Sequence, residues 1–157
     1  MKKTIVLLTL ILSAITLFSF TKHNTVKAPK VTTINYYEQD LPLKELISSI
    51  EKQDKVAIIY FYADWCGPCK RFKKSFKSDL VKEALANAVF IKIDVDEDVE
   101  KQAVHENYGI NVIPTFIKTN PEAEVIAQIT SDEWAEDIPK NISKVMTSFI
   151  NTDRYHK

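Results

Sequence analysis

The chain has only two cysteines, and both lie in one short stretch, residues 65–69, which reads WCGPC. The segment just before it, residues 55–62 (KVAIIYFY), is apolar, β-branched and aromatic, which is typical of a buried strand. The segment just after it, residues 70–85, carries apolar side chains at helical spacing among polar ones. We therefore expect the two cysteines at the junction between a strand and a helix.

This position predicts different roles for the two sulfur atoms. Cys66 falls at the start of the helix, where free backbone N–H groups and the helix dipole favour negative charge. The pKa of its thiol should therefore lie below the value of about 8.5 for a free cysteine. Pro68 suits an early helical position because its missing N–H would have had no partner there. Cys69 follows on the same helix face within disulfide reach, so the pair offers a nucleophile and a resolving thiol.

The motif and its flanking segments resemble the thioredoxin family. The stretch WCGPC and the lysine after it match the family motif residue for residue. The longer run 61–66, followed by Phe72, Lys74 and Phe76, is most similar to one branch. That branch holds the periplasmic thioredoxin-like domain of transmembrane thiol reductases and its small secreted relatives. The resemblance covers about residues 36–151 and implies an α/β thioredoxin fold, a central mixed β-sheet flanked by helices on both faces.

The resemblance also implies how the redox site is built. Cys66 and Cys69 would form the redox disulfide, with Trp65, Gly67 and Pro68 as active-site support. The Gly-Pro pair between the cysteines resembles that of the reducing thioredoxins, which favours reduction of substrate disulfides. That dipeptide is only one determinant of the reduction potential, so the direction of electron flow stays open.

A second stretch, Ile-Pro-Thr at residues 113–115, matches the family motif whose cis proline lies against the cysteines. The resemblance therefore places Pro114 and Ile113, together with Trp65, in a substrate groove. Proline takes the cis form at low cost and leaves neighbouring backbone groups free to pair with a substrate strand. Without the two cysteines, Pro114 would be interpreted as an ordinary edge or turn proline.

Two acids of the family pattern are missing. Tyr60 stands where thioredoxins usually carry a buried aspartate that is thought to move protons, and Lys73 stands where the reductase branch often has a glutamate. Lys92 matches the family lysine that pairs with that aspartate, and here it lacks the partner. We expect Lys92 or a water near Tyr60 to handle the proton. The alternative is that Tyr60 only packs in the core. The missing carboxylate also predicts a better stabilised Cys66 thiolate than in typical thioredoxins.

The periodicity of the remaining chain predicts alternating helices and strands. Helices are expected at 43–53, 70–85, 99–108 and 134–150, and strands at 55–62, 89–95, 115–118 and 124–129. Within 70–85 a second helical piece is expected from residue 79. The acidic residues 96–100 should supply the N-cap of the helix at 99–108. Pro139 should break the start of the last helix. His105 lies among charged residues in the third helix and is expected to be solvated. This order suits a mixed sheet with helices on both faces.

The N-terminal segment has the pattern of a targeting sequence. Two lysines precede residues 4–20, which are apolar and carry no charge. Residues 1–22 are therefore expected to be a secretory signal peptide or an uncleaved membrane anchor. Residues 23–35 are expected to be a linker, 36–151 the thioredoxin-like domain and 152–157 a tail. The domain would then be extracytoplasmic, either periplasmic or secreted, or tethered to the inner membrane.

Composition excludes several other classes of function. The 21 basic and 21 acidic residues balance, and no basic stripe with interleaved aromatics is present, so we expect no nucleic-acid partner. Only two glycines occur, which excludes a glycine-rich phosphate loop. A metal site needs about four ligands, and two cysteines with scattered histidines do not supply them, so we expect neither metal nor cofactor. A purely structural disulfide across two residues would close too little chain to stabilise much.

These observations predict an extracytoplasmic thiol:disulfide oxidoreductase that reduces protein disulfides through a mixed disulfide. The resemblance implies a membrane thiol transporter as electron donor. It also implies disulfide-containing clients, such as oxidised isomerases or the apocytochromes of cytochrome c maturation. Two alternatives stay open. The protein could be a disulfide oxidase or isomerase, or a non-catalytic thioredoxin-fold module that holds a partner.

Overall fold

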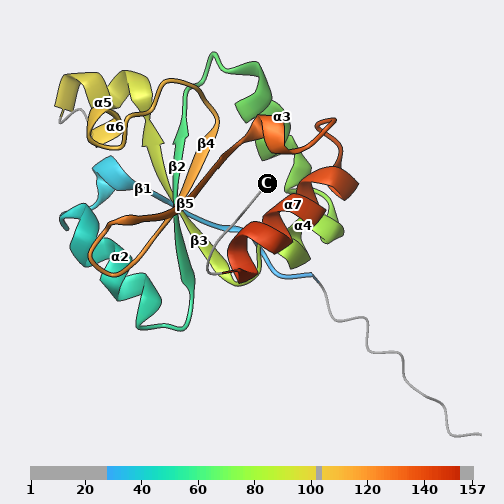
Figure 1. The fold of residues 1–157 in the computed structure, drawn as a ribbon, viewed down its shortest axis with the longest axis horizontal. Helices are drawn as coiled ribbons and strands as arrows, with labels where there is room; N and C mark the ends of the chain where they lie inside the picture. The colour runs from blue at the N-terminus through green and yellow to red at the C-terminus, as the bar shows by residue number, and fades with distance from the viewer. Residues whose placement is uncertain (1–27, 102–103, 153–157) are drawn as a thin grey trace, which may run out of the picture.

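The computed structural model describes residues 28–101 and 104–152, which form a mixed five-stranded sheet between two layers of helices (Figure 1). The strands lie in the order β1-β3-β2-β4-β5 and comprise β1 Thr32–Asn35, β2 Val56–Tyr62, β3 Ala88–Asp94, β4 Thr115–Thr119 and β5 Val125–Thr130. β3 is parallel to both β1 and β2, whereas β4 is antiparallel to both of its neighbours, β2 and β5. The predicted central mixed sheet is confirmed.

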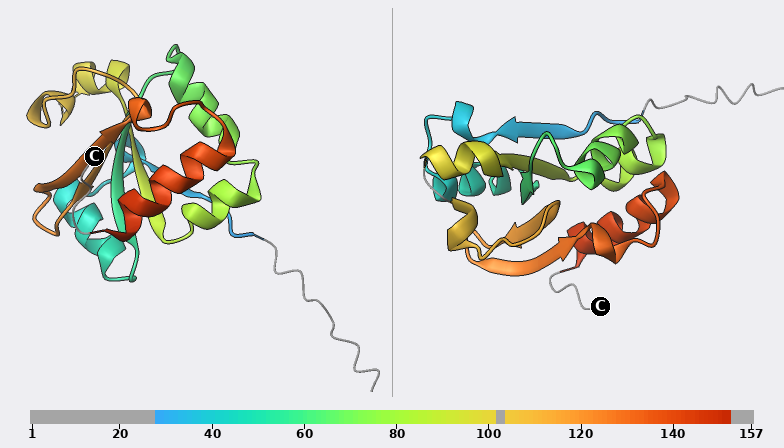
Figure 2. Two further views of the ribbon diagram at one scale, coloured as in Figure 1. Left: turned by 45° about the vertical axis from the view of Figure 1, so that its right-hand side comes forward. Right: turned by 90° about the horizontal axis from the view of Figure 1, so that it is seen from above.

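The helices divide between the two faces of the sheet. One layer contains α2 (Leu43–Glu51), α5 (Val95–Lys101) and α6 (Val104–Asn107), and the other contains α3 (Gly67–Ser75), α4 (Asp79–Ala84) and α7 (Pro139–Asn151). Short 3-10 helices, η2 (Tyr36–Glu38) and η3 (Ser131–Glu133), lie at the ends of β1 and β5. Figure 1 shows the first layer on the left of the sheet and the second on the right, and the views in Figure 2 agree.

Each face of the sheet has its own core, because successive strand residues point to opposite sides. β2 contributes Ile58 and Tyr60 to one core and Ile59 and Phe61 to the other, and all four are buried. The core under α3, α4 and α7 is rich in aromatic side chains, which include Tyr60, Phe72, Phe90, Phe116 and Phe149. The core under α2 is largely aliphatic and includes Ile47, Ile59, Ile91, Ile93 and Ile117. The prediction that residues 55–62 form a buried strand is therefore confirmed.

Helix α3 is held in place by this aromatic core. Phe72 is fully buried, and its ring lies 4.7 Å from Phe116 and 5.0 Å from Phe76 between ring centroids. The helix ends at Ser75, and a second helix, α4, follows it, as the sequence predicts. Ser78, the N-cap residue of α4, has an extended backbone. The start of α3 is thus fixed at the carboxyl end of β2.

The N-terminal boundary of the domain differs from the prediction. Strand β1, Thr32–Asn35, lies within the segment 23–35 that was expected to be a linker. It pairs in parallel with β3, from Thr32 opposite Val89 to Asn35 opposite Lys92. Two of its four residues are exposed and two are half-buried, so the short edge strand has no apolar alternation to reveal it. The domain therefore begins before residue 36.

Two helix starts also differ from the prediction. Helix α5 begins at Val95, directly after β3, rather than at 99. Asp94 is its local acceptor, because the Asp94 side chain takes a hydrogen bond from the backbone N–H of Asp96 at 3.1 Å. Helix α7 begins at Pro139 rather than at 134, since proline suits the first turn of a helix. The periodicity places α7 correctly apart from its first residue, whereas the single helix expected at 99–108 is found as two elements, α5 and α6.

The expected targeting segment, residues 1–22, and the tail after residue 152 lie outside the described residues. Within the described part, no helix combines the length and apolarity that a membrane crossing requires. The same part of the chain contains no group of three or more His, Cys, Asp and Glu side chains arranged for a metal ion.

Candidate active site

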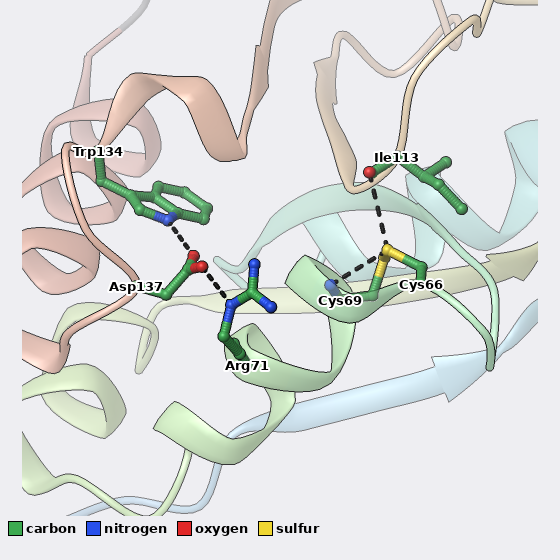
Figure 3. A network of polar contacts seen from close by, with 6 residues as sticks. All are labelled: Cys66, Cys69, Arg71, Ile113, Trp134 and Asp137. Carbon is green, nitrogen blue, oxygen red and sulfur yellow. Dashed lines mark hydrogen bonds and ion pairs between the residues drawn. A yellow bond between two sulfur atoms is a disulfide. The ribbon is translucent and has the colours of Figure 1, made fainter.

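Cys66 and Cys69 form a disulfide at the start of α3 (Figure 3). Cys66 is the N-cap residue, with an extended backbone (φ −68°, ψ 113°), and its sulfur accepts a hydrogen bond from the backbone N–H of Cys69 at 3.1 Å. One of the orphan amides of the helix N-terminus therefore points at this sulfur. A thiolate on Cys66 would meet the same donor and the positive end of the helix dipole. The local geometry is the one that the strand-to-helix junction predicts.

Gly67 and Pro68 form the first turn of α3. Pro68 lies within the first two helical positions, where a missing N–H has no consequence for helix hydrogen bonding. A Cβ atom added at Gly67 would lie 3.2 Å from Nη1 of Arg71, the mobile end of a long side chain. The space around Gly67 therefore does not by itself require glycine.

The loop that precedes β4 passes beside the disulfide. The peptide bond between Ile113 and Pro114 is cis, as the family resemblance implies. The carbonyl oxygen of Ile113 lies 3.7 Å from the Cys66 sulfur (Figure 3). Cys66 and Cys69 are each only 3% exposed in this oxidised state, and Pro114 is buried. A substrate must therefore approach the Cys66 sulfur along the surface beside Ile113.

That surface contains a groove of about 450 Å³. Its apolar lining consists of Trp65, Val95, Ile110, Val112 and Ile113. Trp65 is 65% exposed, and its indole Nε1 donates a hydrogen bond to Asp96 at 2.8 Å. The structure thus brings Trp65 and Ile113 into one groove, whereas Pro114, which was expected there too, is buried and does not line it.

A buried carboxylate holds His105, one of the residues that line the groove, and sequence reasoning missed it. Asp98 is fully buried and accepts hydrogen bonds from the Tyr37 hydroxyl and from the backbone N–H groups of Val104 and His105. Nδ1 of His105 also contacts this carboxylate, and the His105 side chain is only 16% exposed. The expectation of a solvated His105 is therefore wrong, because an acid seven residues earlier in the chain draws the imidazole inward.

Tyr60 lies inside the aromatic core, 4% exposed. Its ring stacks on Phe116 at 4.9 Å and on Tyr62 at 5.3 Å between centroids, and it meets Phe72 and Phe90 edge-on at 5.5 and 6.5 Å. Burial, and to a lesser extent the neighbouring Tyr62, raises the pKa of Tyr60, so the phenol is neutral at physiological pH. These contacts favour the alternative in which Tyr60 packs the core.

Lys92 lies opposite Tyr60 in the β2–β3 pairing, and its ammonium lies 4.3 Å from the centroid of the Tyr62 ring. This is a cation–π contact. Lys92, Tyr60, Tyr62 and Cys69 all line a second cavity, of about 350 Å³, which shares no lining residue with the groove. Burial first, and then the charge of Asp94, raises the pKa of Tyr62 to about 12. Lys92, one of the two groups expected to handle the proton, thus lines the same cavity as Cys69.

A polar network ties α3 to the segment before α7 (Figure 3). Arg71 forms an ion pair with Asp137, and the indole Nε1 of Trp134 donates to the same carboxylate at 2.7 Å. Burial alone would raise the pKa of Asp137, but the hydrogen bonds from Trp134 and Arg71 and the charge of Arg71 outweigh it and lower that pKa. The partners are 66 residues apart in sequence, so no local pattern predicts the contact.

Comparison with known proteins agrees with this geometry. The thioredoxin family model matches residues 40–144. A thioredoxin H-type of Oryza sativa subsp. indica is 36% identical over 104 residues, which cover 65% of this chain and 81% of the relative. Thioredoxin-1 of Drosophila melanogaster is 36% identical over 80 residues, 51% of this chain and 71% of the relative.

Solved structures show the same fold. A poplar wild-type thioredoxin h superposes with a TM-score of 0.54 at 21% identity and covers 78% of this chain and 98% of its own. A point-mutant thioredoxin from Halobacterium salinarum gives 0.51 at 23% identity, covering 80% and 96%. The family match, the fold and the cysteine pair at the helix N-terminus lead to one conclusion: the chain belongs to the thioredoxin family and is a disulfide oxidoreductase of the thioredoxin type.

Proposed function

We propose that this protein is an extracytoplasmic reductase of protein disulfides. The main supporting observation is the environment of Cys66. Its sulfur faces the Cys69 amide at 3.1 Å and the Ile113 carbonyl at 3.7 Å, at the edge of an apolar groove. An amide that points at the sulfur favours the thiolate, and the nearby carbonyl offers a backbone acceptor to an incoming strand.

The reaction follows from the two sulfur positions. The reduced protein attacks a substrate disulfide with the Cys66 thiolate, which forms a mixed disulfide and releases one substrate sulfur as a thiolate. Cys69, deprotonated, then attacks the Cys66 sulfur. The mixed disulfide breaks, the second substrate sulfur leaves as a thiolate, and the Cys66–Cys69 disulfide forms. The substrate gains two electrons and the protein loses two, so an external thiol donor must restore the dithiol.

The groove suits an extended segment of a protein substrate. Trp65 and Val112, which are 65% and 50% exposed, line the same groove. Apolar side chains that gather in one exposed groove mark a site of interaction, unlike apolar side chains scattered singly over the surface. A substrate strand would lie along the loop before Pro114 and pair with the backbone there, while the side chains next to its cysteine contact the indole.

Lys92 is the group that we assign to the second step. Cys69 is buried, and burial disfavours a thiolate. The ammonium of Lys92 lines the same cavity, so its positive charge stabilises the anion that Cys69 must form. Tyr60 contributes packing rather than a proton, since burial raises the pKa of its phenol and makes it a weaker acid, and its ring contacts four aromatic neighbours.

The location and the donor rest on the N-terminal segment. Residues 4–20 are apolar and uncharged after two lysines, a pattern that supports secretion or membrane anchoring. In an oxidising compartment a reductase needs electrons from across the membrane. We infer that a membrane thiol transporter reduces the Cys66–Cys69 disulfide, as in the reductase branch that the motif region resembles. Fractionation of cells that express the full chain, with protease added to spheroplasts, tests the location.

Trapping of mixed disulfides tests the reductase function. The Cys69→Ser variant keeps the nucleophile and loses the resolver, so it should accumulate covalent adducts with client proteins that dissolve on addition of dithiothreitol. Cys66→Ser is the matched control and should trap far fewer. If both variants trap equally, or if Cys66→Ser retains disulfide reductase activity, the proposed mechanism is wrong. A reduction potential near about −120 mV, the oxidising end of the family, would instead identify an oxidase or isomerase.

A further inference from the structure

The cavity behind Cys69 is separate from the substrate groove. It measures about 350 Å³, within the size range of small-molecule sites. Its lining includes the resolving residue Cys69 with Tyr60, Tyr62 and Lys92. None of its lining residues is shared with the groove, which lies around Trp65 and Ile113. A molecule in this cavity would therefore lie against the resolving cysteine, not on the path by which a substrate reaches the attacking one.

The charged residues of the lining are mostly cationic. Lys30, Lys70, Lys73 and Lys92 line the cavity, against the single carboxylate of Asp64. The chain as a whole is neutral, so this excess is local. The negative charges of Asp94, Glu97 and Glu38 also raise the pKa of Tyr62, but these three residues do not line the cavity.

The ammonium of Lys92, which is half-buried, provides the main attraction for an anion in this cavity. Its contact in the described part of the chain is the face of the Tyr62 ring at 4.3 Å, and no carboxylate there forms an ion pair with it. A partly buried cation whose contact is a ring face has lost hydration that the cation–π contact replaces only in part. An anion bound beside Lys92 supplies the ammonium with a counter-charge.

The rest of the lining suits an apolar group. Val31 is 8% exposed and Tyr60 4%, and Phe76 packs against the aromatic core, so the lining also includes an aliphatic and aromatic surface. An inorganic ion would satisfy the lysines and leave this surface wet, whereas an organic anion covers both. Sites of this kind combine an apolar lining with a few placed polar groups.

We propose that the cavity behind Cys69 binds a small amphipathic organic anion. Its carboxylate or phosphate lies at Lys92 with the rim lysines, and its apolar body lies against Val31 and Phe76. Lysine is a point charge that accepts either anionic group, so the shared feature is one negative charge on a compact apolar frame. The binding does not depend on the proposed reductase activity and is measured without it.

The test is a nuclear magnetic resonance titration of the labelled, oxidised full chain with four probes: 2-naphthoate, 2-naphthyl phosphate, the neutral amide 2-naphthamide, and acetate. The two naphthyl anions should shift signals of Val31, Phe76 and Lys92 and saturate below about 10 mM. The neutral amide and acetate should each bind at least about tenfold more weakly, because one lacks the charge and the other the apolar body. Tighter binding of naphthoate or of the phosphate identifies which anionic group the site prefers.

Charge-removing variants separate this site from general attraction to lysine. Lys92→Met should weaken naphthoate binding at least about fivefold, and the exposed rim variant Lys73→Met about twofold, while Lys52→Met on the opposite face should have no effect. Lys73→Met keeps the test valid if Lys92→Met does not fold. The proposal is overturned if naphthoate and naphthamide bind equally, if the shifts centre on Ile113 in the groove, if neither cavity variant weakens binding, or if nothing saturates.

Discussion

Replacement of Tyr60 tests whether this position serves the core or the chemistry. Tyr60 occupies the place of an acid in the family pattern, and its ring is buried among Tyr62, Phe72, Phe90 and Phe116. Tyr60→Ala removes the whole ring. Tyr60→Phe removes only the hydroxyl and keeps every ring contact. The two variants therefore separate packing from proton transfer.

The structure sets the size of the expected effect. Removal of a buried aromatic side chain costs about 3–5 kcal/mol, and four aromatic neighbours at centroid distances from 4.9 to 6.5 Å place Tyr60→Ala near the upper end. For the roughly 120 residues that the structure describes, the entropy of unfolding is about 0.25 kcal/mol/K, so Tm should fall by about 15–20 °C. Tyr60→Phe should change the free energy of unfolding by less than about 1 kcal/mol.

The assay is equilibrium urea unfolding of the oxidised variants, combined with the rate of mixed-disulfide resolution. Tyr60→Phe should resolve the mixed disulfide within about fivefold of the wild-type rate, since loss of the hydroxyl changes the free energy by less than about 1 kcal/mol. The packing account is refuted if Tyr60→Ala loses less than about 2 kcal/mol, which is below the range for a buried ring. It is equally refuted if Tyr60→Phe slows resolution as strongly as a lost proton donor would, by about a hundredfold.

Four further substitutions extend these tests. Lys92→Met should slow resolution by Cys69 about tenfold and leave the first attack unchanged, whereas Lys52→Met should alter neither step; stopped-flow kinetics separates the two. Trp65→Phe loses the indole hydrogen bond at the groove and should raise KM for a protein disulfide about fivefold. Gly109→Ala places a side chain at φ +64° and should cost about 1 kcal/mol in urea unfolding, although nothing obstructs its Cβ. Asp137→Asn should cost about 1–2 kcal/mol at neutral pH. The folded pKa of Asp137 is lowered, so the stability that the carboxylate contributes is present above about pH 4 and is lost as the pH falls through the folded value. Below about pH 4 the free energy of unfolding of the variant should therefore fall less steeply with pH than that of the wild type.

Much of the fold could be predicted because strong local signals carry it. The run of apolar residues in β2 is buried on both faces, and the cysteine motif after it marks the helix start. Strand β1 gave no such signal, because its stability comes from pairing with β3 and not from its own pattern. The first turn of α5 was missed for a related reason, since the acidic residues there suit either a cap or a helical first turn.

Some residues of the candidate site could likewise be predicted from the sequence, and others could not. Trp65 and the two cysteines follow from the motif, and Ile113 and Pro114 from the family resemblance. The Asp98–His105 contact and the Arg71–Asp137 pair could not be predicted, because each joins residues that only the folded chain brings together. The lysine-lined cavity is of the same kind, since its walls come from β1, β2, β3 and α3.

The central claim is that the start of α3 stabilises the thiolate of Cys66. Its most direct test is a titration of the reduced Cys69→Ser variant, in which only the Cys66 thiolate contributes to the ultraviolet absorbance of the sulfur. The account predicts a thiol pKa clearly below about 8.5 in the folded protein, returning to that value in denaturant. A folded-state pKa at or above that of free cysteine would contradict it.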